Sequence, residues 1–170
     1  MDNGRFVKRQ LLFVFVVDNG RRQSYLELRG RTRHGQRIHG RGIAGYEIIY
    51  GSAAGADVIF AGDGGSQLWG GADTAADAIA GGNGSDIFIG GRFQGADVFY
   101  NASSSDAVNL TDATLSDIVG TLGNDNGIAI GFNTGTVINI QSTDTLSAAI
   151  NLADGSSWRY NHVAKSWQSA

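Results

Sequence analysis

Short alternating stretches, each with an apolar residue at its centre, recur between glycine-rich polar turns along residues 52 to 109. Examples are VIF (58–60), QLW (67–69) and IFI (87–89). Segments this short that point one apolar side chain to a shared side are typical of half-buried β-strands. The central residues, which we expect to face a common interior, are Ile59, Leu68, Ile79, Phe88 and Phe99.

The turns repeat together with the strands. The stretch GGNGSDIFI (81–89) is the most complete copy of a unit in which glycines precede one aspartate and a strand follows. Related units fill 52–60, 61–69, 70–80 and 90–100 without gaps, and a sixth unit, 101–109, keeps the aspartate but has lost its glycines. Consecutive units of this kind indicate a solenoid, in which each unit packs against its neighbours.

The spacing of the acidic positions predicts how the units stack. Intervals of nine and eleven residues alternate, so that two units make one coil of 20 residues. Turns that are one coil apart should lie on the same edge of a two-sided solenoid. We therefore expect one column formed by Asp57, Asp77 and Asp97, with Asp117 as a possible extension, and a second column formed by Ser66, Asp86 and Asp106.

The remaining sequence divides into two flanks. Residues 110–170 contain alternating segments at 127–132, 135–141 and 148–161, with hairpin signals NDNG (124–127) and ADG (153–155). We expect them to form a C-terminal β cap that contains Trp158 and Trp167, because a solenoid end needs cover. Residues 1–46 are of uncertain structure. The segment GIAGYEIIYG (42–51) resembles a degraded repeat with Glu47 in the acidic place.

Composition supports an all-β chain with many tight turns. The chain has 26 glycines, no proline and 42% hydrophobic residues, which is unlike a disordered linker. It has no cysteine, so disulfide and thiolate chemistry are excluded. A metal ion is a common substitute for disulfide cross-links.

The repeat pattern resembles that of a known protein family. Residues 51–109 resemble the RTX (GGxGxDxUx) hemolysin-type repeats of secreted bacterial proteins. The resemblance implies a parallel β-roll, that is a two-sided β-solenoid, at 47–109, followed by the cap at 110–170. It also implies bound calcium, an upstream functional domain in a longer protein, and export by type I secretion machinery.

Calcium binding would draw on aspartate carboxylates and turn carbonyls, because Ca²⁺ takes six to eight oxygen ligands. We expect ions between Asp57 and Asp77, between Asp77 and Asp97, and between Asp86 and Asp106, and a weaker site at Ser66. The two-residue insertions in turns 70–75 and 90–95 put full coordination in the first column in doubt. The expected ligand residues are Gly55, Asp57, Gly62, Gly64, Gly71, Asp77, Gly82, Gly84, Asp86, Gly91, Gly95, Asp97 and Asp106.

A metal-free solenoid is the alternative. Stacked carboxylates about 5 Å apart repel one another unless a cation lies between them. We therefore expect calcium to serve folding as well as to occupy sites. The glycines should supply positive φ angles that turn carbonyl oxygens inward.

The basic N-terminal flank allows several interpretations. Residues 1–46 hold ten of the 13 Lys and Arg but three of the 16 Asp and Glu. LLFVFVV (11–17) superficially resembles the apolar part of a signal peptide, but no small-residue cleavage site follows and it is too short to span a membrane. The basic segment 30–42 lacks the interleaved aromatics of a nucleic-acid site. We favour a truncated upstream region or an out-of-register start.

The sequence motifs that are present, and those that are missing, limit the functions we expect. His34, His39 and His162 belong to no recognisable catalytic motif, so we expect no enzyme. We expect a calcium-dependent module of a secreted or cell-surface protein, with neither a transmembrane segment nor a nucleic-acid partner. The alternative is an adhesin or carbohydrate-binding module that uses Trp69, Phe93, Tyr100 and Trp158 as stacking groups. Burial of Trp158 and Trp167 would favour the scaffold.

Overall fold

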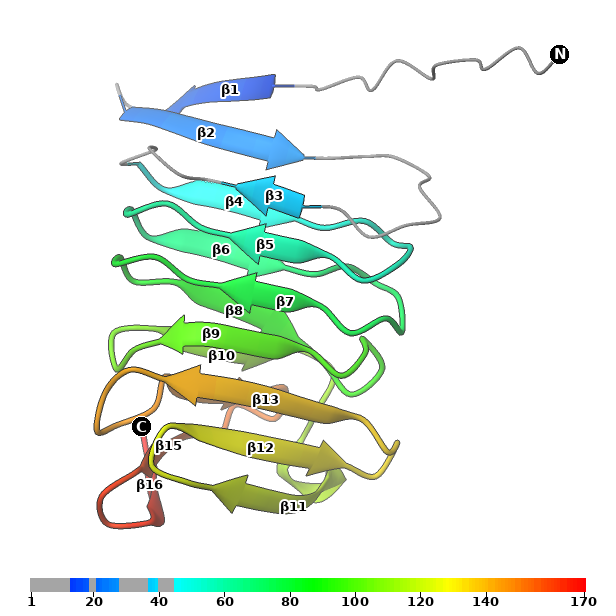
Figure 1. Cartoon of the computed structure of the whole chain (residues 1–170), viewed down its shortest axis with the longest axis vertical. Coiled ribbons are helices and arrows are strands. Elements are labelled where there is room, and N and C mark those ends of the chain that lie inside the picture. The colour runs from blue at the N-terminus through cyan, green and yellow to red at the C-terminus, as the bar shows by residue number, and fades with distance from the viewer. Residues whose placement is uncertain (1–12, 19–20, 28–36, 40–44) are drawn as a thin grey trace, which may run out of the picture.

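Two β-sheets form the body of the protein, as the computed structural model shows (Figure 1). The structure describes residues 13–18, 21–27, 37–39 and 45–170. Within this part the only helix is a 3₁₀ turn, Leu115–Asp117. No helix of the described part is long and apolar enough to cross a membrane. The expected all-β class is confirmed, with a parallel β-solenoid followed by antiparallel strands.

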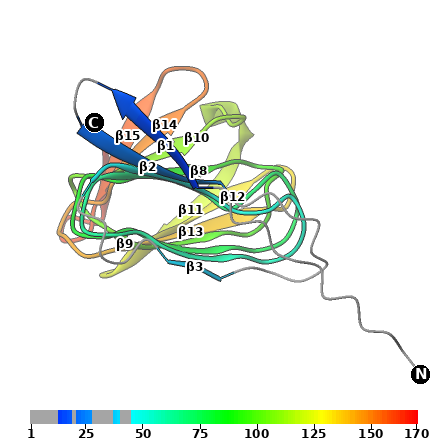
Figure 2. The same cartoon turned by 90° about the horizontal axis from the view of Figure 1, so that it is seen from above.

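The nine-stranded sheet contains, in spatial order, β1 (Phe13–Asp18), β2 (Arg21–Glu27), β4 (Glu47–Tyr50), β6 (Ser66–Trp69), β8 (Ile87–Gly90), β10 (Ala107–Leu110), β14 (Ala149–Leu152), β15 (Ser157–Asn161) and β16 (Ser166–Ser169). The seven-stranded sheet contains β11 (Ile118–Gly123), β12 (Gly127–Phe132), β13 (Val137–Ser142), β9 (Val98–Ala102), β7 (Ala78–Ala80), β5 (Val58–Phe60) and β3 (Arg37–His39). The chain crosses from one sheet to the other after each short strand from β4 to β10, so each pair of strands makes one flattened coil (Figure 2).

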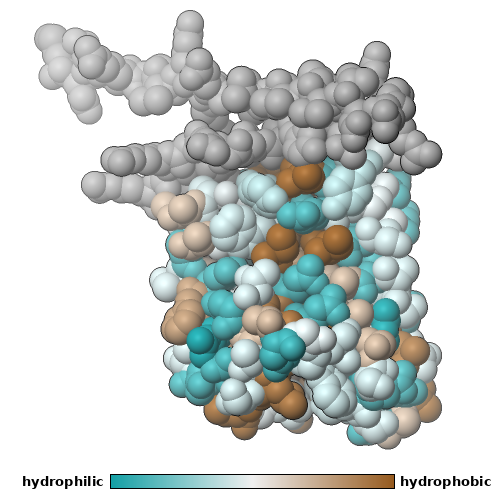
Figure 3. Space-filling view, turned by 180° about the vertical axis from the view of Figure 1, so that it is seen from behind, coloured by the Kyte–Doolittle hydropathy of each residue, from teal (hydrophilic) through white to brown (hydrophobic). Residues whose placement is uncertain are grey.

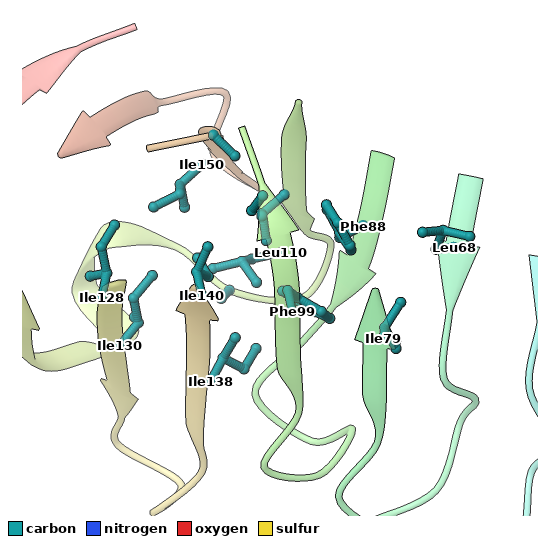
Figure 4. Close-up of a cluster of buried hydrophobic side chains, with 14 of the residues drawn as sticks. Leu68, Ile79, Phe88, Phe99, Leu110, Ile128, Ile130, Ile138, Ile140 and Ile150 are labelled. Atoms are coloured by element: carbon teal, nitrogen blue, oxygen red, sulfur yellow. The ribbon is translucent and has the colours of Figure 1, made fainter. Parts of the chain in front are cut away.

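The predicted coil of 20 residues is confirmed by the register of the parallel strands. Ile59 lies opposite Ile79, and Ile79 lies opposite Phe99 in the seven-stranded sheet. In the other sheet Leu68 lies opposite Phe88. All five of these side chains are fully buried. Leu68, Ile79, Phe88 and Phe99 point into the space between the sheets, where Leu110 and isoleucines of the C-terminal strands join them (Figure 4).

The parallel stack extends upstream of the complete repeats. β4 pairs in parallel with β6, and Glu47 lies opposite Ser66, as expected for a degraded repeat. β3 pairs in parallel with β5, and its Ile38 is buried opposite Ile59. Residues 13–18 form β1, which pairs with β2. The basic stretches 30–36 and 40–42 lie outside the described residues, as do residues 11 and 12.

The C-terminal strands both extend and close the solenoid. The two expected hairpins are present: β11 and β12 are antiparallel around Asn124–Gly127, and β14 and β15 are antiparallel around Ala153–Gly155. β13 also pairs in parallel with β9, and β14 in parallel with β10. One further layer of the stack is therefore built from sequence that does not carry the repeat. Trp158 and Trp167 are partly buried against the core, as the expected cap requires.

The outer face of the nine-stranded sheet mixes polar and apolar side chains. Ile48, Gln67 and Ile87 occupy matching positions on three neighbouring strands and are all half-buried. Hydrophobic residues lie over the middle of this face and are interrupted by polar ones (Figure 3). Such scattered apolar residues are normal on a protein surface.

Candidate cation-binding columns at the turns

The repeat aspartates close their own turns. One carboxylate oxygen, Oδ2, accepts a hydrogen bond from a backbone N–H near the start of the same turn. Asp57 accepts from Ser52 at 2.6 Å, Asp86 from Gly82 at 2.9 Å, and Asp106 from Ser103 at 2.6 Å. In these three turns the carboxylate directly before the strand therefore has a local structural role.

The other carboxylate oxygen joins neighbouring coils. Asp77 Oδ1 accepts from the Asp57 N–H at 2.7 Å, and Asp97 Oδ1 accepts from the Asp77 N–H at 3.0 Å. On the opposite edge Asp106 Oδ1 accepts from the Asp86 N–H at 2.8 Å. The columns Asp57–Asp77–Asp97 and Asp86–Asp106 are therefore present as the spacing predicted. We call them the first and the second column.

The second column begins with Glu47 and Ser66. Glu47 is 2% exposed, its Oε2 accepts from the Gly62 N–H at 2.8 Å, and burial raises its pKa. Ser66 is fully buried, and its hydroxyl donates to the Gly64 carbonyl at 3.3 Å. A neutral hydroxyl thus lies between the positions of Glu47 and Asp86 in the stack.

The possible extension of the first column to Asp117 is wrong. The strand beside β9 is β13, where Asn139 lies opposite Val98 and donates its N–H to the Asp97 carbonyl at 2.9 Å. Asp117 instead accepts from the Thr114 N–H and hydroxyl, and it pairs with Arg92. The bonds from Thr114 lower the pKa of Asp117, and the Arg92 charge adds to this effect.

Burial makes the ionised form of the column aspartates costly. It raises the pKa of Asp77 to about 7, against the influence of the hydrogen bond from Asp57, and the charges of Asp97 and Asp57 raise it further. Burial likewise raises the pKa of Asp86 to about 6, with a contribution from Asp106, and that of Asp97 to about 6. Like charges one coil apart therefore face each other in a poorly solvated place.

A further carboxylate, Asp73, lies beside the first column and was not among the expected ligands. It belongs to the longer turn, where its Oδ1 accepts from the Ala75 N–H at 2.7 Å. Its Oδ2 is buried and has no hydrogen-bond partner. The Asp73 charge raises the pKa of both Asp77 and Asp97. The two-residue insertion thus adds a possible oxygen ligand for a cation to the first column. The acidic residue inside the insertion was the sequence signal that could have identified this ligand.

Glycine serves two different purposes in these turns. Gly55, Gly71 and Gly95 have φ of 89°, 138° and 96°, as expected for left-handed backbone. The same expectation is wrong for Gly62, Gly64, Gly82, Gly84 and Gly91, which are not among the positive-φ glycines. At Gly82 a Cβ atom would lie 1.6 Å from the Gly62 carbonyl oxygen. Close approach of the preceding coil, and not a positive φ, requires this glycine.

The donor set fits a hard, oxygen-seeking cation. Nowhere in the described part do three His, Cys, Asp or Glu side chains form a metal-binding group, so backbone carbonyls would have to complete any coordination shell. Ca²⁺ accepts such ligands, and a carboxylate oxygen that takes one N–H bond keeps a second lone pair. The ion pairs identified among the described residues, Arg92–Asp117 and Lys165–Asp125, leave Asp77, Asp86, Asp97 and Asp106 without a basic partner.

The aromatic residues considered for ligand stacking do not gather on one face. Trp69 donates its Nε1–H to Gln94 Oε1 at 2.8 Å and is half-buried. Phe93 is 60% exposed, with the Arg92 guanidinium 4.9 Å from its ring centre. Trp158 packs against the core near the C-terminus. Tyr100 is half-buried on β9 of the seven-stranded sheet. This distribution favours the scaffold over the alternative of an aromatic binding surface.

Comparison with known proteins adds little beyond the fold. No protein-family model matches the chain, and no curated protein matches it. A matching solved structure is the AlgE6R3 subunit of the mannuronan C5-epimerase from Azotobacter vinelandii, at 20% identity. The match covers 62% of this chain and 71% of that one, with a TM-score of 0.40. Similarity this distant carries no functional argument, so the site rests on the geometry above.

Proposed function

We propose that this chain is a calcium-binding RTX-type β-roll module that promotes the folding and stability of a secreted or cell-surface bacterial protein. The observation that carries the proposal is the first column. Asp77 and Asp97 are buried one coil apart, Asp73 adds its charge to both, and within the described part of the chain no basic side chain pairs with the two column residues. A divalent cation would relieve this concentration of negative charge.

Calcium would be held between stacked turns. Asp57 with Asp77, Asp77 with Asp97, and Asp86 with Asp106 would supply carboxylate oxygens, and the turn carbonyls would supply the rest. The ion contributes positive charge and ligand bonds that exist in the folded state alone, so its binding energy becomes folding energy. The chain's own contribution is the column itself, in which the carboxylates of Asp77 and Asp97 each accept a backbone N–H bond from the neighbouring coil.

The remaining parts of the proposal concern location and partners. A cysteine-free module that requires calcium suits an extracellular compartment, where weak sites with Kd of about 10⁻⁴–10⁻³ M would be filled. An upstream functional domain and type I secretion machinery are the partners that the RTX resemblance implies. We assign no catalytic role to the module.

The deciding experiment is far-UV circular dichroism of the full 170-residue chain during a calcium titration, with magnesium as the control ion. The proposal predicts a cooperative gain of β signal with calcium and little change with equal magnesium. A chain that is already fully folded in chelator and does not melt at a higher temperature with calcium would overturn it.

An Asp77→Asn variant sharpens the test. The amide oxygen can still accept the Asp57 N–H, but the charge is lost. We expect the variant to be more stable than the parent in chelator and to gain less from calcium. Asp63→Asn is the matched control, because Asp63 is exposed and lies outside the columns, and it should respond to calcium as the parent does.

A further inference from the structure

A polar groove of about 790 Å³ runs along the edge where β5, β7, β9 and β13 end. This edge lies at the left of Figure 1, where the arrowheads of these four strands point. The four strands are consecutive neighbours in the seven-stranded sheet. The groove therefore crosses several coils instead of lying within one turn.

Every coil contributes polar groups to this groove, although not from the same position of each turn, since Asp63 and Asn83 correspond to Ser103 and not to Asn101. Asp63 follows β5, Asn83 follows β7, Asn101 lies in the last part of β9, and Thr143 follows β13. All four are exposed. Neighbouring strands are about 4.8 Å apart, so this row of polar groups extends over roughly 14 Å. A row of exposed polar groups that crosses successive coils suits a linear polymer that lies along the stack.

Two of the polar groups are held in defined positions. The Asn83 amide donates to Asp63 Oδ1 at 2.9 Å, across 20 residues of sequence. Asn101 has a φ of 57°, which is uncommon for a residue other than glycine, and its amide lies 3.4 Å from the Gly81 carbonyl. Groups fixed in this way lose little side-chain entropy when a ligand binds.

Phe60 adds an apolar platform at one end of the groove. On one side its ring stacks on His39, with centres 4.8 Å apart and planes 6° apart. Its strand neighbour on the other side is Ala80, whose methyl group is too small to cover an aromatic ring. Phe60 and Ala80 both line the groove.

The chemistry of the lining selects among linear polymers. Among the described residues, the groove lining has a single carboxylate, Asp63, and no basic side chain, and a described cation close to it is Arg37, whose guanidinium lies 5.4 Å from the centre of the Phe60 ring. A lining with so little positive charge disfavours nucleic acids and other polyanions. The groove lies at the turns and not along a free strand edge, which disfavours an extended peptide. Amide, hydroxyl and carboxylate groups beside an aromatic ring match a chain that carries hydroxyl groups and apolar C–H faces. We propose that this groove binds an uncharged linear glycan that runs along the stack.

The glycan groove uses different side chains from the cation columns. The column carboxylates are buried and do not line the groove, whereas the side chains of Asp63, Asn83, Asn101 and Thr143 are exposed there. Gly62 and Gly82 line the groove and are also expected calcium ligands. The test of the groove therefore uses substitutions of groove side chains that are not among the expected calcium ligands. The protein is used under whichever condition gives the folded circular dichroism spectrum, so that failure of the calcium proposal leaves the groove proposal testable.

Isothermal titration calorimetry with defined hexasaccharides tests the proposal. The probes are cellohexaose, laminarihexaose, mannohexaose and chitohexaose, with oligogalacturonate as the anionic comparison and glucose as the monomer. We expect at least one uncharged hexasaccharide to bind, and glucose and the anionic oligomer to bind at least tenfold more weakly. Absence of binding to all four uncharged probes, or preference for the anionic one, would overturn the proposal.

Variants locate the binding. Asn83→Ala removes one exposed amide and should weaken hexasaccharide binding about tenfold, as should Phe60→Leu, which shortens the platform. Phe93→Ala is the matched control, because this exposed ring belongs to the turn at 90–95 and does not line the groove. Unchanged affinity in Asn83→Ala, or loss of binding in Phe93→Ala, would show that the glycan binds elsewhere and would contradict the proposal.

Discussion

Titration of the column aspartates dominates the expected pH dependence at the residue scale. The folded-state pKa values of Asp77, Asp86 and Asp97 are raised from 3.8 to about 7, 6 and 6. Between pH 4 and pH 7 the folded chain therefore binds more protons than the unfolded chain, and its metal-free stability falls as pH rises. At about 1.4 kcal/mol per pKa unit, the loss amounts to several kcal/mol.

Urea unfolding in chelator at pH 5 and pH 8 measures this effect. We expect the higher stability at pH 5 and a smaller difference in Asp77→Asn. Calcium should reduce the pH dependence, because it competes with protons for the same oxygens. The pKa of Asp117 is lowered from its ordinary value of 3.8, so this carboxylate stays ionised between pH 5 and pH 8 and does not contribute to the difference. Higher stability at pH 8 than at pH 5 in chelator would contradict the expected burial cost.

Close contact between coils makes Gly82 sensitive to substitution. A Cβ atom there would lie 1.6 Å from a backbone oxygen that cannot move without shifting the preceding turn. We expect Gly82→Ala to cost about 1–3 kcal/mol of unfolding free energy, as overpacking does. In Gly120→Ala the new atom meets nothing within 4 Å, so this control should lie within about 0.5 kcal/mol of the parent. Equal unfolding midpoints for the two variants would exclude the contact as the reason for glycine.

The repeat made most residues of the columns predictable, but not all of them. A period of 20 residues places Asp57 over Asp77 whatever the detailed turn conformation is. Asp73 could not be placed in the same way, because it lies in an insertion that has no counterpart in the GGxGxD pattern. The purpose of Gly82 was also misjudged, since a local sequence does not report the approach of a carbonyl from another coil.

At the element scale, β11 is an edge strand of its sheet, and such a strand can form backbone hydrogen bonds with another chain. It is the outermost strand of the seven-stranded sheet, and Val119 and Leu122 on it are 69% and 73% exposed. Open apolar edge strands promote aggregation, and lysine counteracts it. We expect Val119→Lys with Leu122→Lys to reduce light scattering at high protein concentration while leaving stability within about 1 kcal/mol. A larger loss of stability would mean that these side chains are covered in the folded protein.

Strands of the repeats followed from the sequence, whereas the pairing of the C-terminal strands did not. β5 to β10 coincide with the apolar positions because each repeat defines its own strand and its neighbour. Local turn signals also gave the hairpins at Asn124–Gly127 and Ala153–Gly155. β13 pairs with β9, and β14 pairs with β10, although about 40 residues of chain separate the two strands of each pair. Hydrophobic alternation within a strand does not tell which distant strand it will pair with or in which register.

For the whole molecule, the proposed calcium sites predict how thermal stability depends on the ion. A ligand that binds only the folded state stabilises it by about 2.7 kcal/mol per site at 100 times Kd. Three filled sites would therefore raise the melting temperature steeply and continuously with calcium concentration. Differential scanning calorimetry between 0.1 and 100 times the measured Kd gives this dependence. A rise of stability with the logarithm of calcium concentration whose slope corresponds to one site would mean that only one pair of coils holds an ion.

The 20-residue register also determines how the protein should respond to force. Each coil is hydrogen-bonded to the coils directly above and below it, and these bonds run along the stack. Tension applied along this direction loads one interface between coils at a time, so the molecule should lengthen in discrete steps. Each step would release 20 residues, or roughly 70 Å of contour length. The solenoid would then act as an extensible spacer that absorbs mechanical work coil by coil.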